Sequence, residues 1–311
     1  MTTPAVSQVV LAHNHEPFVE QCLDSVAEQT FDDFELVIMD DCSTDRTVER
    51  IEAWLHNASC EARLVVNERN LGACASHKVA LQHCRGELIS VVSADDYYEP
   101  GKIERQQRFF GELDGSVAAV FSNARRVDEH GREIELVYKT GLPPTEGRIF
   151  DRLIEGNFII APTVMARRTA LEEAGGYDES LFYEDYDMWL RLADRYEFRY
   201  LPGTLVNYRI LPFSHSRNPA HAAAMHESRA RALLKWYGKD AETDQVILRR
   251  AWKNGRRVLA ADRARGRRLL QEVCAIAPTL RHRTGVAASS VPGAERVLAV
   301  GFAVADGVRA R

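Results

Sequence analysis

Two adjacent carboxylates, Asp95 and Asp96, end an apolar run that starts at Leu88. The run predicts a buried strand, and the Tyr-Tyr-Glu-Pro segment after it predicts a turn. Carboxylate oxygens at the carboxyl end of a buried strand can hold a hard divalent cation, Mn²⁺ or Mg²⁺, against phosphate groups. The alternative is a solvated turn, because aspartate is common where strands end.

The elements before this pair alternate between strand-like and helix-like patterns. We expect strands at 6–11, 34–39, 63–66 and 88–92, with helices at 17–29, 44–55 and 73–84 between them. Ser43 or Thr44 is the expected N-cap of the second helix. This alternation predicts an α/β fold with a mostly parallel central sheet, whose ligands bind at the carboxyl ends of the strands. Asn14, Asp40-Asp41 and Asp95-Asp96 follow three of those strand ends.

The second part of the sequence has shorter and more mixed patterns. Strands are expected at 117–121, 161–166 and 200–208, and helices at 171–174 and 184–196. The segment 128–150 reads as a loop or hairpin region because it is rich in Gly and Pro.

Length and composition are those of an ordinary globular protein: 311 residues, 45% hydrophobic and 27% charged. No apolar run approaches the roughly 18 residues of a membrane span, and we expect no signal peptide. The six cysteines form no CxxC pair, which favours a reduced, cytoplasmic setting over a disulfide or zinc framework.

Charge is distributed unevenly along the chain. Residues 1–216 carry 21 Lys and Arg against 37 Asp and Glu, and residues 217–311 carry 19 against 8. This shift predicts a catalytic domain at 1–220 and an Arg-rich, mostly helical extension at 221–311. The pairs at 249–250 and 256–257 are seven residues apart and so share a helix face. That face has three readings: contact with an anionic membrane at its inner surface, contact with the acidic domain or a second copy in a homodimer, or a solvated face. A nucleic-acid partner is not expected, because no aromatic platform is interleaved with the arginines.

Four segments in order resemble the inverting glycosyltransferases of family 2. They are the Leu-Val-Ile-Met-Asp-Asp-Cys-Ser-Thr-Asp block at 36–45, the Asn-Leu-Gly at 70–72 with Gly86-Glu87, the Ser-Ala-Asp-Asp at 93–96, and the Gly-Gly-Tyr-Asp-Glu at 175–179. The last is followed by Glu184-Asp185, Tyr208-Arg209 and His215. The resemblance covers roughly residues 5–217 and implies a nucleotide-binding domain of the GT-A type.

The resemblance implies transfer of one sugar from a nucleotide-diphosphate sugar to a hydroxyl acceptor, such as a glycan, a lipid-linked sugar or a small molecule. It makes Asp185 the general base. It places Asp41 at the nucleobase edge, where a carboxylate accepts the imide N–H of uracil or thymine, so UDP or dTDP is favoured over GDP. The remaining implied roles are nucleotide binding by Asn14, Lys78 and Asp95, metal binding by Asp95, Asp96 and His215, and weaker acceptor or sugar contacts by Glu184, Gly176, Tyr177, Asp178 and Arg209.

Several of these residues also have a structural alternative. Asp41 could cap a helix, Asp185 could be a first-turn acid favoured by the helix dipole, and His215 and Lys78 could be solvated. Arg209 could face the diphosphate or pair with an acid.

The chain also departs from the family pattern. Ser93 stands where many members have the first Asp of the DxD motif, and the processive Gln/Arg-x-x-Arg-Trp signature does not follow Asp185. The second departure favours single-sugar transfer. The first keeps open a degenerate nucleotide-sugar-binding protein with the same fold and little or no catalysis. A sugar nucleotidyltransferase is disfavoured, because residues 12–17 contain no glycine for a phosphate-gripping loop.

Overall fold

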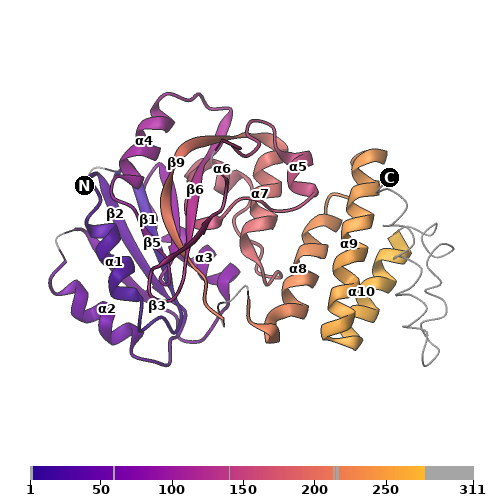
Figure 1. The fold of residues 1–311 in the computed structure, drawn as a ribbon, viewed down its shortest axis with the longest axis horizontal. Coiled ribbons are helices and arrows are strands. Elements are labelled where there is room, and N and C mark those ends of the chain that lie inside the picture. Colours follow the sequence, from indigo (N-terminus) through magenta and orange to yellow (C-terminus); the bar gives the residue numbers. More distant parts are fainter. Residues whose placement is uncertain (1–2, 59, 140, 213, 215–216, 277–311) are drawn as a thin grey trace. The chain divides into compact units, whose positions relative to one another are not determined.

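A computed structural model describes residues 3–58, 60–139, 141–212, 214 and 217–276 (Figure 1). The chain divides into two compact units, Met1–Ser214 and His215–Arg311. The boundary expected at residue 220 falls just inside the second unit. That the two units have separate functions stays a prediction.

The first unit is built on one nine-stranded sheet with strand order β3-β2-β1-β4-β8-β6-β9-β5, and β7 pairs with β6. Parallel ladders join β1 to β2 and β4, β2 to β3, and β6 to β9, and they are the longest in the sheet. The predicted α/β fold with a mostly parallel sheet is confirmed. The strands are β1 Val6–Ala12, β2 Phe34–Asp40, β3 Ala62–Val66, β4 Leu88–Ser93, β5 Tyr97–Tyr98, β6 Val117–Val127, β7 Glu133–Leu136, β8 Met165–Arg167 and β9 Glu197–Arg209.

Helices cover this sheet and bury their apolar positions against it. In α1, Val19, Cys22, Leu23 and Val26 are all buried, which is the spacing of one helix face. The helices of the unit are α1 Val19–Ala27, α2 Thr47–Leu55, α3 Ala73–Gln82, α4 Lys102–Gly111, α5 Phe150–Ile154, α6 Arg168–Glu173 and α7 Glu184–Arg195, with a 3₁₀ turn η1 at Ala161–Thr163.

The entry to β4 depends on a glycine. A Cβ built on Gly86 would lie 2.4 Å from the backbone nitrogen of Ser7, so no other residue fits without moving β1. The Gly86 N–H donates to the Ser7 hydroxyl at 2.8 Å, and that hydroxyl donates to Glu35 at 2.6 Å. This buried chain fixes β1, β2 and β4 in register, and so fixes where their carboxyl ends meet.

Three expected element boundaries are corrected. The helix after β2 begins at Thr47, and neither Ser43 nor Thr44 caps it; Asp45 Oδ1 accepts the Thr47 N–H at 3.0 Å instead. The expected strand at 161–166 is η1 followed by β8, because Pro162 lacks an N–H for a ladder. Finally, β6 runs on to Val127, where it pairs with β7 of the predicted hairpin.

Lys102 is fully buried at the start of α4. Its Nζ atom donates to the Ser90 hydroxyl and lies 4.1 Å from the centroid of the Tyr98 ring. Burial lowers the pKa of Lys102 well below its ordinary value. The unfolded chain therefore binds one more proton than the folded chain at every pH between that lowered pKa and about 10.4.

We expect Lys102→Met to stabilise the protein at pH 7, because a long apolar side chain avoids burying an amine. The free energy of unfolding of the parent should fall, relative to the variant, by up to about 1.4 kcal/mol for each pH unit lowered below 10. Urea denaturation of both proteins from pH 7 to 10 measures this difference. Subtraction cancels the contribution of the buried thiols, which lose their protons between pH 7 and 10 only in the unfolded chain. A parent and variant with parallel curves would show that Lys102 stays charged.

The second unit contains the turn η2 Pro219–His221 and the helices α8 Ala222–Leu234, α9 Ala241–Ala261 and α10 Arg263–Ile276. Trp252, Val258, Leu269 and Val273 form the centre of its own core. A Cβ on Gly266 would lie 2.2 Å from the Cα of Leu259, so glycine lets α9 and α10 approach closely. The described helices include none that is long and apolar enough to cross a membrane.

Candidate active site

The loop after β2 is held by its own polar side chains. Asp40 accepts the Ser43 N–H at 2.8 Å and the Ser43 hydroxyl at 2.5 Å, and it is fully buried. Asn14, at the end of β1, has φ +57° and accepts the Thr44 N–H at 2.8 Å. Asp40 and Asn14 therefore shape the rim of the sheet. The contacts of Asn14 are with the loop, and its predicted contact with a nucleotide stays a prediction.

Asp41 organises the next loop toward α3. Its Oδ1 accepts from Asn67 Nδ2 and the Leu71 N–H, and its Oδ2 accepts from the Gly72 N–H, all at 2.8 Å. Gly72 is the N-cap of α3, so Asp41 holds the entry to that helix rather than capping α2. A carboxylate offers about four lone-pair positions, and these three bonds leave one on Oδ2.

Asp95 and Asp96 lie at the carboxyl end of β4, where the sequence places them, and only 8% and 2% of their surfaces are exposed. Burial and the Asp95 carboxylate raise the pKa of Asp96 well above its ordinary value. Two neighbouring carboxylates resist ionising together because like charges repel, and a bound cation would offset that repulsion. The Nε2 atom of His15 lies 4.0 Å from Asp95 Oδ1.

Arg209, at the end of β9, clamps the segment that carries this pair. Its backbone N–H donates to Asp96 Oδ1 at 2.7 Å, and its side-chain Nε donates to the Asp95 carbonyl at 2.7 Å. Its two terminal nitrogens donate to the Glu129 carbonyl and to Gln21 Oε1. Arg209 is 3% exposed, so its guanidinium is used within the protein. The structure favours a positioning role over contact with the sugar or the diphosphate.

Asp185 lies in the first turn of α7 and is 5% exposed. Its Oδ2 accepts from Asn157 Nδ2 and from the Tyr183 hydroxyl, both at 3.2 Å. Glu184 precedes it, with Oε2 buried and no hydrogen-bond partner for that atom among the described residues. The helix start favours negative charge here, since the N-terminal end of the dipole is positive.

Helix α3 lies beside these acids. Burial raises the pKa of the Cys74 thiol, and the carboxylates of Glu184 and Asp178 raise it further. The His77 ring packs on Tyr177 with centroids 4.6 Å apart. The first turns of α3 and α7 and the turn at 177–178 thus form one neighbourhood, which joins the loop held by Asp41 to Asp185.

Several weaker candidates have roles in the fold. The Gly176 N–H donates to the Leu171 carbonyl and the Gly175 N–H to that of Glu172, with φ +70° and +85°, which is the Schellman motif that ends α6. Tyr177 is buried, so it does not present its ring to a sugar. The contacts of Gly176 and Tyr177 with a sugar or an acceptor stay predictions.

Two further candidates lie in the exposed segment next to them. Asp178 Oδ1 accepts the Ser180 N–H at 2.9 Å. Lys78 pairs with Glu179, and both side chains are about half exposed. Lys78 can therefore exchange this partner for a phosphate at little cost, because such an exposed pair is worth under about 1 kcal/mol. His215 lies outside the described residues.

Sequence reasoning missed four residues of this region: His13, His15, Asn67 and Asn157. His13 Nδ1 lies 2.8 Å from the Asp41 carbonyl, and its Nε2 faces Asn70 Nδ2 at 3.1 Å. Only the strand order could have indicated these contacts, because the partners are 28 to 57 residues apart in the chain.

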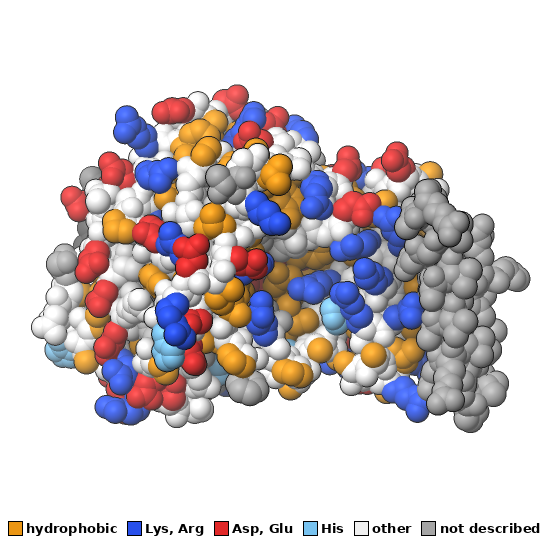
Figure 2. Space-filling view, in the orientation of Figure 1, with side chains coloured by type: hydrophobic (Ala, Val, Ile, Leu, Met, Phe, Trp, Pro, Cys, Tyr) orange, Lys and Arg blue, Asp and Glu red, His pale blue; other side chains and the backbone are white. Residues whose placement is uncertain are grey.

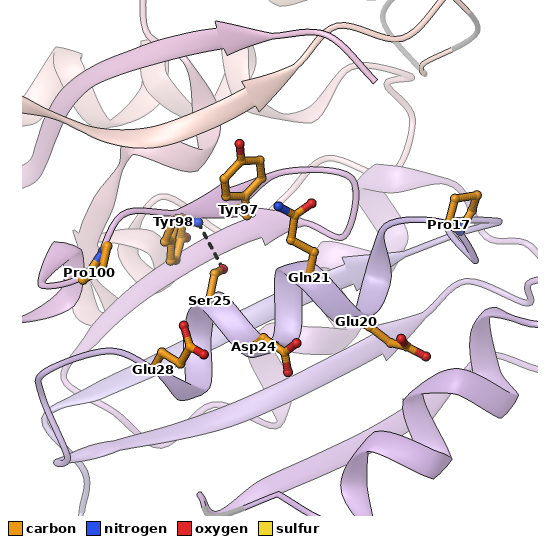
Figure 3. A pocket seen from close by; sticks show the side chains of 9 residues that line it. All are labelled: Pro17, Glu20, Gln21, Asp24, Ser25, Glu28, Tyr97, Tyr98 and Pro100. Carbon is orange, nitrogen blue, oxygen red and sulfur yellow. Dashed lines mark hydrogen bonds between the residues drawn. The ribbon is translucent and has the colours of Figure 1, made fainter. Parts of the chain in front are cut away.

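A separate pocket of about 430 Å³ lies along α1 (Figure 3). Glu20 and Asp24 project from successive turns of α1, Glu28 lies at its C-cap, and Tyr97 stands opposite Gln21. The pocket contains none of the candidate site residues, so we do not assign it to the active site.

The fold and the carboxylates at its strand ends define a nucleotide-binding enzyme domain of the α/β class. Comparison with known proteins identifies the family: the model described as "Glycosyl transferase family 2" matches residues 7–175. Because the match covers more than half of the chain, the chain belongs to this family of glycosyltransferases, and the predicted resemblance is confirmed.

Individual relatives agree with this assignment. The glycosyltransferase MJ1057 of Methanocaldococcus jannaschii is 28% identical over 213 residues, 68% of this chain and 72% of that protein. Residues 1–349 of S. aureus TarS, solved with UDP-GlcNAc, superpose with a TM-score of 0.66 at 20% identity, over 87% of this chain and 81% of that one. The mannosyltransferase PcManGT of Pyrobaculum calidifontis, solved with GDP-Man and Mn²⁺, gives 0.60 at 18% identity, over 97% and 85%. The two structures establish the shared GT-A fold.

Proposed function

We propose that this glycosyltransferase moves one sugar from a nucleotide-diphosphate sugar to a hydroxyl acceptor with inversion at the anomeric carbon. The observation that carries the proposal is Asp185, a nearly buried carboxylate at the start of α7, in a family 2 domain whose β4 ends in Asp95 and Asp96. An acceptor hydroxyl has a pKa far above neutral, so a base must take its proton as the new bond forms. Asp185 takes that role.

The carboxylates of Asp95 and Asp96 would hold a divalent cation, Mn²⁺ or Mg²⁺. Hard oxygen ligands suit such ions. Burial, and then the neighbouring Asp95 carboxylate, raise the pKa of Asp96, and a bound cation would favour the ionised form of both groups. Among the residues that the structure describes, no cluster of three or more potential ligands occurs, so water, phosphate or His215 would complete the set. When bound, the cation offsets the negative charge that the diphosphate gains on leaving.

The nucleobase is proposed to meet Asp41 Oδ2. Three of the lone-pair positions of this carboxylate accept from Asn67, Leu71 and Gly72. One remaining acceptor position suits the single imide N–H of uracil or thymine better than the two adjacent donors of guanine. We therefore propose UDP or dTDP as the carrier. We also propose that the Lys78 ammonium leaves its ion pair with Glu179 and binds the phosphates of the donor.

A thermal-shift panel tests the donor assignment. UDP, dTDP and GDP, each with Mn²⁺, with Mg²⁺ and with EDTA, are compared at equal concentration. A ligand that binds only the native state at 100 times its Kd stabilises it by about 2.7 kcal/mol. Greater stabilisation by UDP or dTDP than by GDP supports the proposal. Greater stabilisation by GDP would show that Asp41 does not recognise the nucleobase in this way.

The alternative is a nucleotide-sugar-binding protein with little catalysis, which Ser93 motivates. It predicts the same thermal shifts. The two functions are distinguished by incubating the protein with nucleotide sugars of the nucleoside diphosphate that gives the largest shift and following the release of that nucleoside diphosphate. Release above that of a protein-free control supports the enzyme, and release equal to that control supports the binder.

The second unit is proposed to contact an anionic membrane surface through α9, which would bring the enzyme to lipid-linked acceptors at the inner face of the membrane. Arg249, Arg250, Lys253, Arg256 and Arg257 fall within an arc of about 120° on this helix, and residues 245–261 contain no acid. The opposite face, with Ile247, Ala251, Trp252 and Val258, is buried in the core of the unit. Figure 2 shows Lys and Arg side chains spread over the visible face of the region that Figure 1 labels α8, α9 and α10.

We expect the full chain to pellet with anionic phosphatidylserine vesicles at low salt, and not with neutral phosphatidylcholine vesicles. Changing Arg249, Lys253 and Arg257 to Gln should weaken pelleting on the order of 10²-fold, since each basic residue near the surface contributes roughly 1 kcal/mol. Arg63→Gln with Arg108→Gln, two exposed positions of the first unit, is the charge control. No pelleting at low salt would reject the membrane, and size-exclusion chromatography would then test a homodimer.

A further inference from the structure

Two side chains that do not belong to α7 converge on one oxygen of Asp185. Asn157 Nδ2 and the Tyr183 hydroxyl each lie 3.2 Å from Oδ2, and they lie 3.4 Å from each other. Tyr183 is the residue before α7, whereas Asn157 comes from the loop after α5, 28 residues away in the chain. The three groups form a closed triangle around a carboxylate that is 5% exposed.

This arrangement opposes the effect of burial. Removing a carboxylate from water favours its protonated form, which cannot accept a proton from the acceptor hydroxyl. Hydrogen bonds donated to the carboxylate favour the ionised form, and bonds to a charged group are about twice as strong as neutral ones. Two donors on the same oxygen also fix the rotation of the carboxyl group.

We propose that Asn157 and Tyr183 are positioning residues that keep Asp185 ionised and fix its orientation for proton transfer. The inference rests on the proposed base role of Asp185. It adds that the loop after α5, outside every motif of the sequence, sets the pH range in which the enzyme works.

The other titratable groups that the described residues place near Asp185 are the same in all the variants used below. Helix α3 supplies Cys74 and His77, the turn before α7 supplies Tyr177 and Asp178, and α7 itself supplies Glu184, Asp187 and Arg191. Their effects cancel when a variant is compared with the parent, so a difference reports the contact that was changed.

Asn157→Asp is the most informative substitution. Asn157 Oδ1 accepts the Ile159 N–H at 3.1 Å, and aspartate keeps that acceptor and the side-chain shape. It replaces only the amide donor with a carboxylate oxygen, which adds a like charge beside Asp185. Tyr183→Phe keeps the ring and removes the other donor. Asn57→Asp, at the exposed end of α2, controls for one added charge.

The test titrates Asp185 directly. Protein labelled with ¹³C at the aspartate carboxyl carbon is followed by NMR against pH, and the Asp185 signal is identified by its loss in Asp185→Asn. We expect its titration midpoint to rise by at least about one pH unit in Asn157→Asp, by less in Tyr183→Phe, and not at all in Asn57→Asp. The acid limb of kcat/KM, measured with a nucleotide sugar of the nucleoside diphosphate that the thermal-shift panel selects, should move with it.

The outcomes separate this inference from the proposed function. If the Asp185 midpoint in both Asn157→Asp and Tyr183→Phe stays within about 0.3 pH unit of the parent, the positioning role of Asn157 and Tyr183 is overturned, whichever residue is the general base. A midpoint that moves while the acid limb of kcat/KM stays in place would overturn Asp185 as the base, and with it any catalytic role for Asn157. Movement of both together supports the inference.

Discussion

Asp185→Asn should lower kcat by about 10²-fold or more and leave the affinity for the nucleoside diphosphate nearly unchanged. An amide has the size of a carboxylate but cannot accept the proton of the acceptor hydroxyl, and general-base catalysis contributes on the order of 10² to 10⁴ in rate. Asp185 contacts Asn157 and Tyr183 rather than the Asp95–Asp96 pair in the described contacts, so nucleotide binding should survive. Steady-state turnover and a UDP or dTDP titration measure the two effects.

The matched control is Asp151→Asn, which removes an exposed carboxylate from the first turn of α5 in the same unit. It should retain the activity of the parent. If Asp185→Asn stays within a few-fold of the parent, Asp185 is not the base, and Glu184, Asp178 and Asp187 become the candidates. Their Gln or Asn variants would then be compared in the same assay.

The first half of the sheet could be predicted from the sequence because its signals are local. Each of β1, β2 and β4 is an apolar run that ends in polar residues, and a parallel strand buried on both faces has this composition. The strand order then brings their ends together, which is why Asp41 and the Asp95–Asp96 pair could be expected on one rim.

The second half was harder to predict because its pairing depends on distant segments. β8 has three residues and is inserted between β4 and β6, with antiparallel neighbours on both sides. Nothing in three residues specifies two partners that lie about 45 to 80 positions away. Such pairing is selected by the packing of the whole core, which a local pattern does not contain.

The same limit applies to the site. Arg209 is part of the Tyr-Arg pair that the family resemblance indicated, but its hydrogen bonds need Gln21, Asp95, Asp96 and Glu129 to be placed first. Asn157 has no motif at all. Residues that bind a ligand recur in recognisable patterns, whereas residues that hold those residues are chosen by geometry.

The Asp95 and Asp96 carboxylates should favour nucleotide binding when Mn²⁺ is present and oppose it when EDTA removes the cation. With Mn²⁺ present, Asp95→Asn or Asp96→Asn removes a ligand charge and should weaken binding of the preferred nucleoside diphosphate on the order of tenfold or more. In EDTA the negative charge that the pair carries repels the diphosphate, so the same variants should bind it as well as the parent or slightly better. Asparagine is preferred to alanine, because its amide oxygen still accepts the Arg209 N–H that Asp96 holds at 2.7 Å.

Isothermal titration of each variant with and without Mn²⁺ gives the four affinities of this cycle. Asp32→Asn, at an exposed position before β2, controls for the loss of one negative charge from the unit. His215→Ala should show a smaller version of the Mn²⁺-dependent loss. If the variants weaken nucleotide binding equally in Mn²⁺ and in EDTA, the carboxylates act through the fold, by way of the Arg209 clamp. Turnover of the intact enzyme that is insensitive to EDTA would make Ser93 the mark of a transferase that needs no metal, because a hydroxyl there supplies no ligand charge.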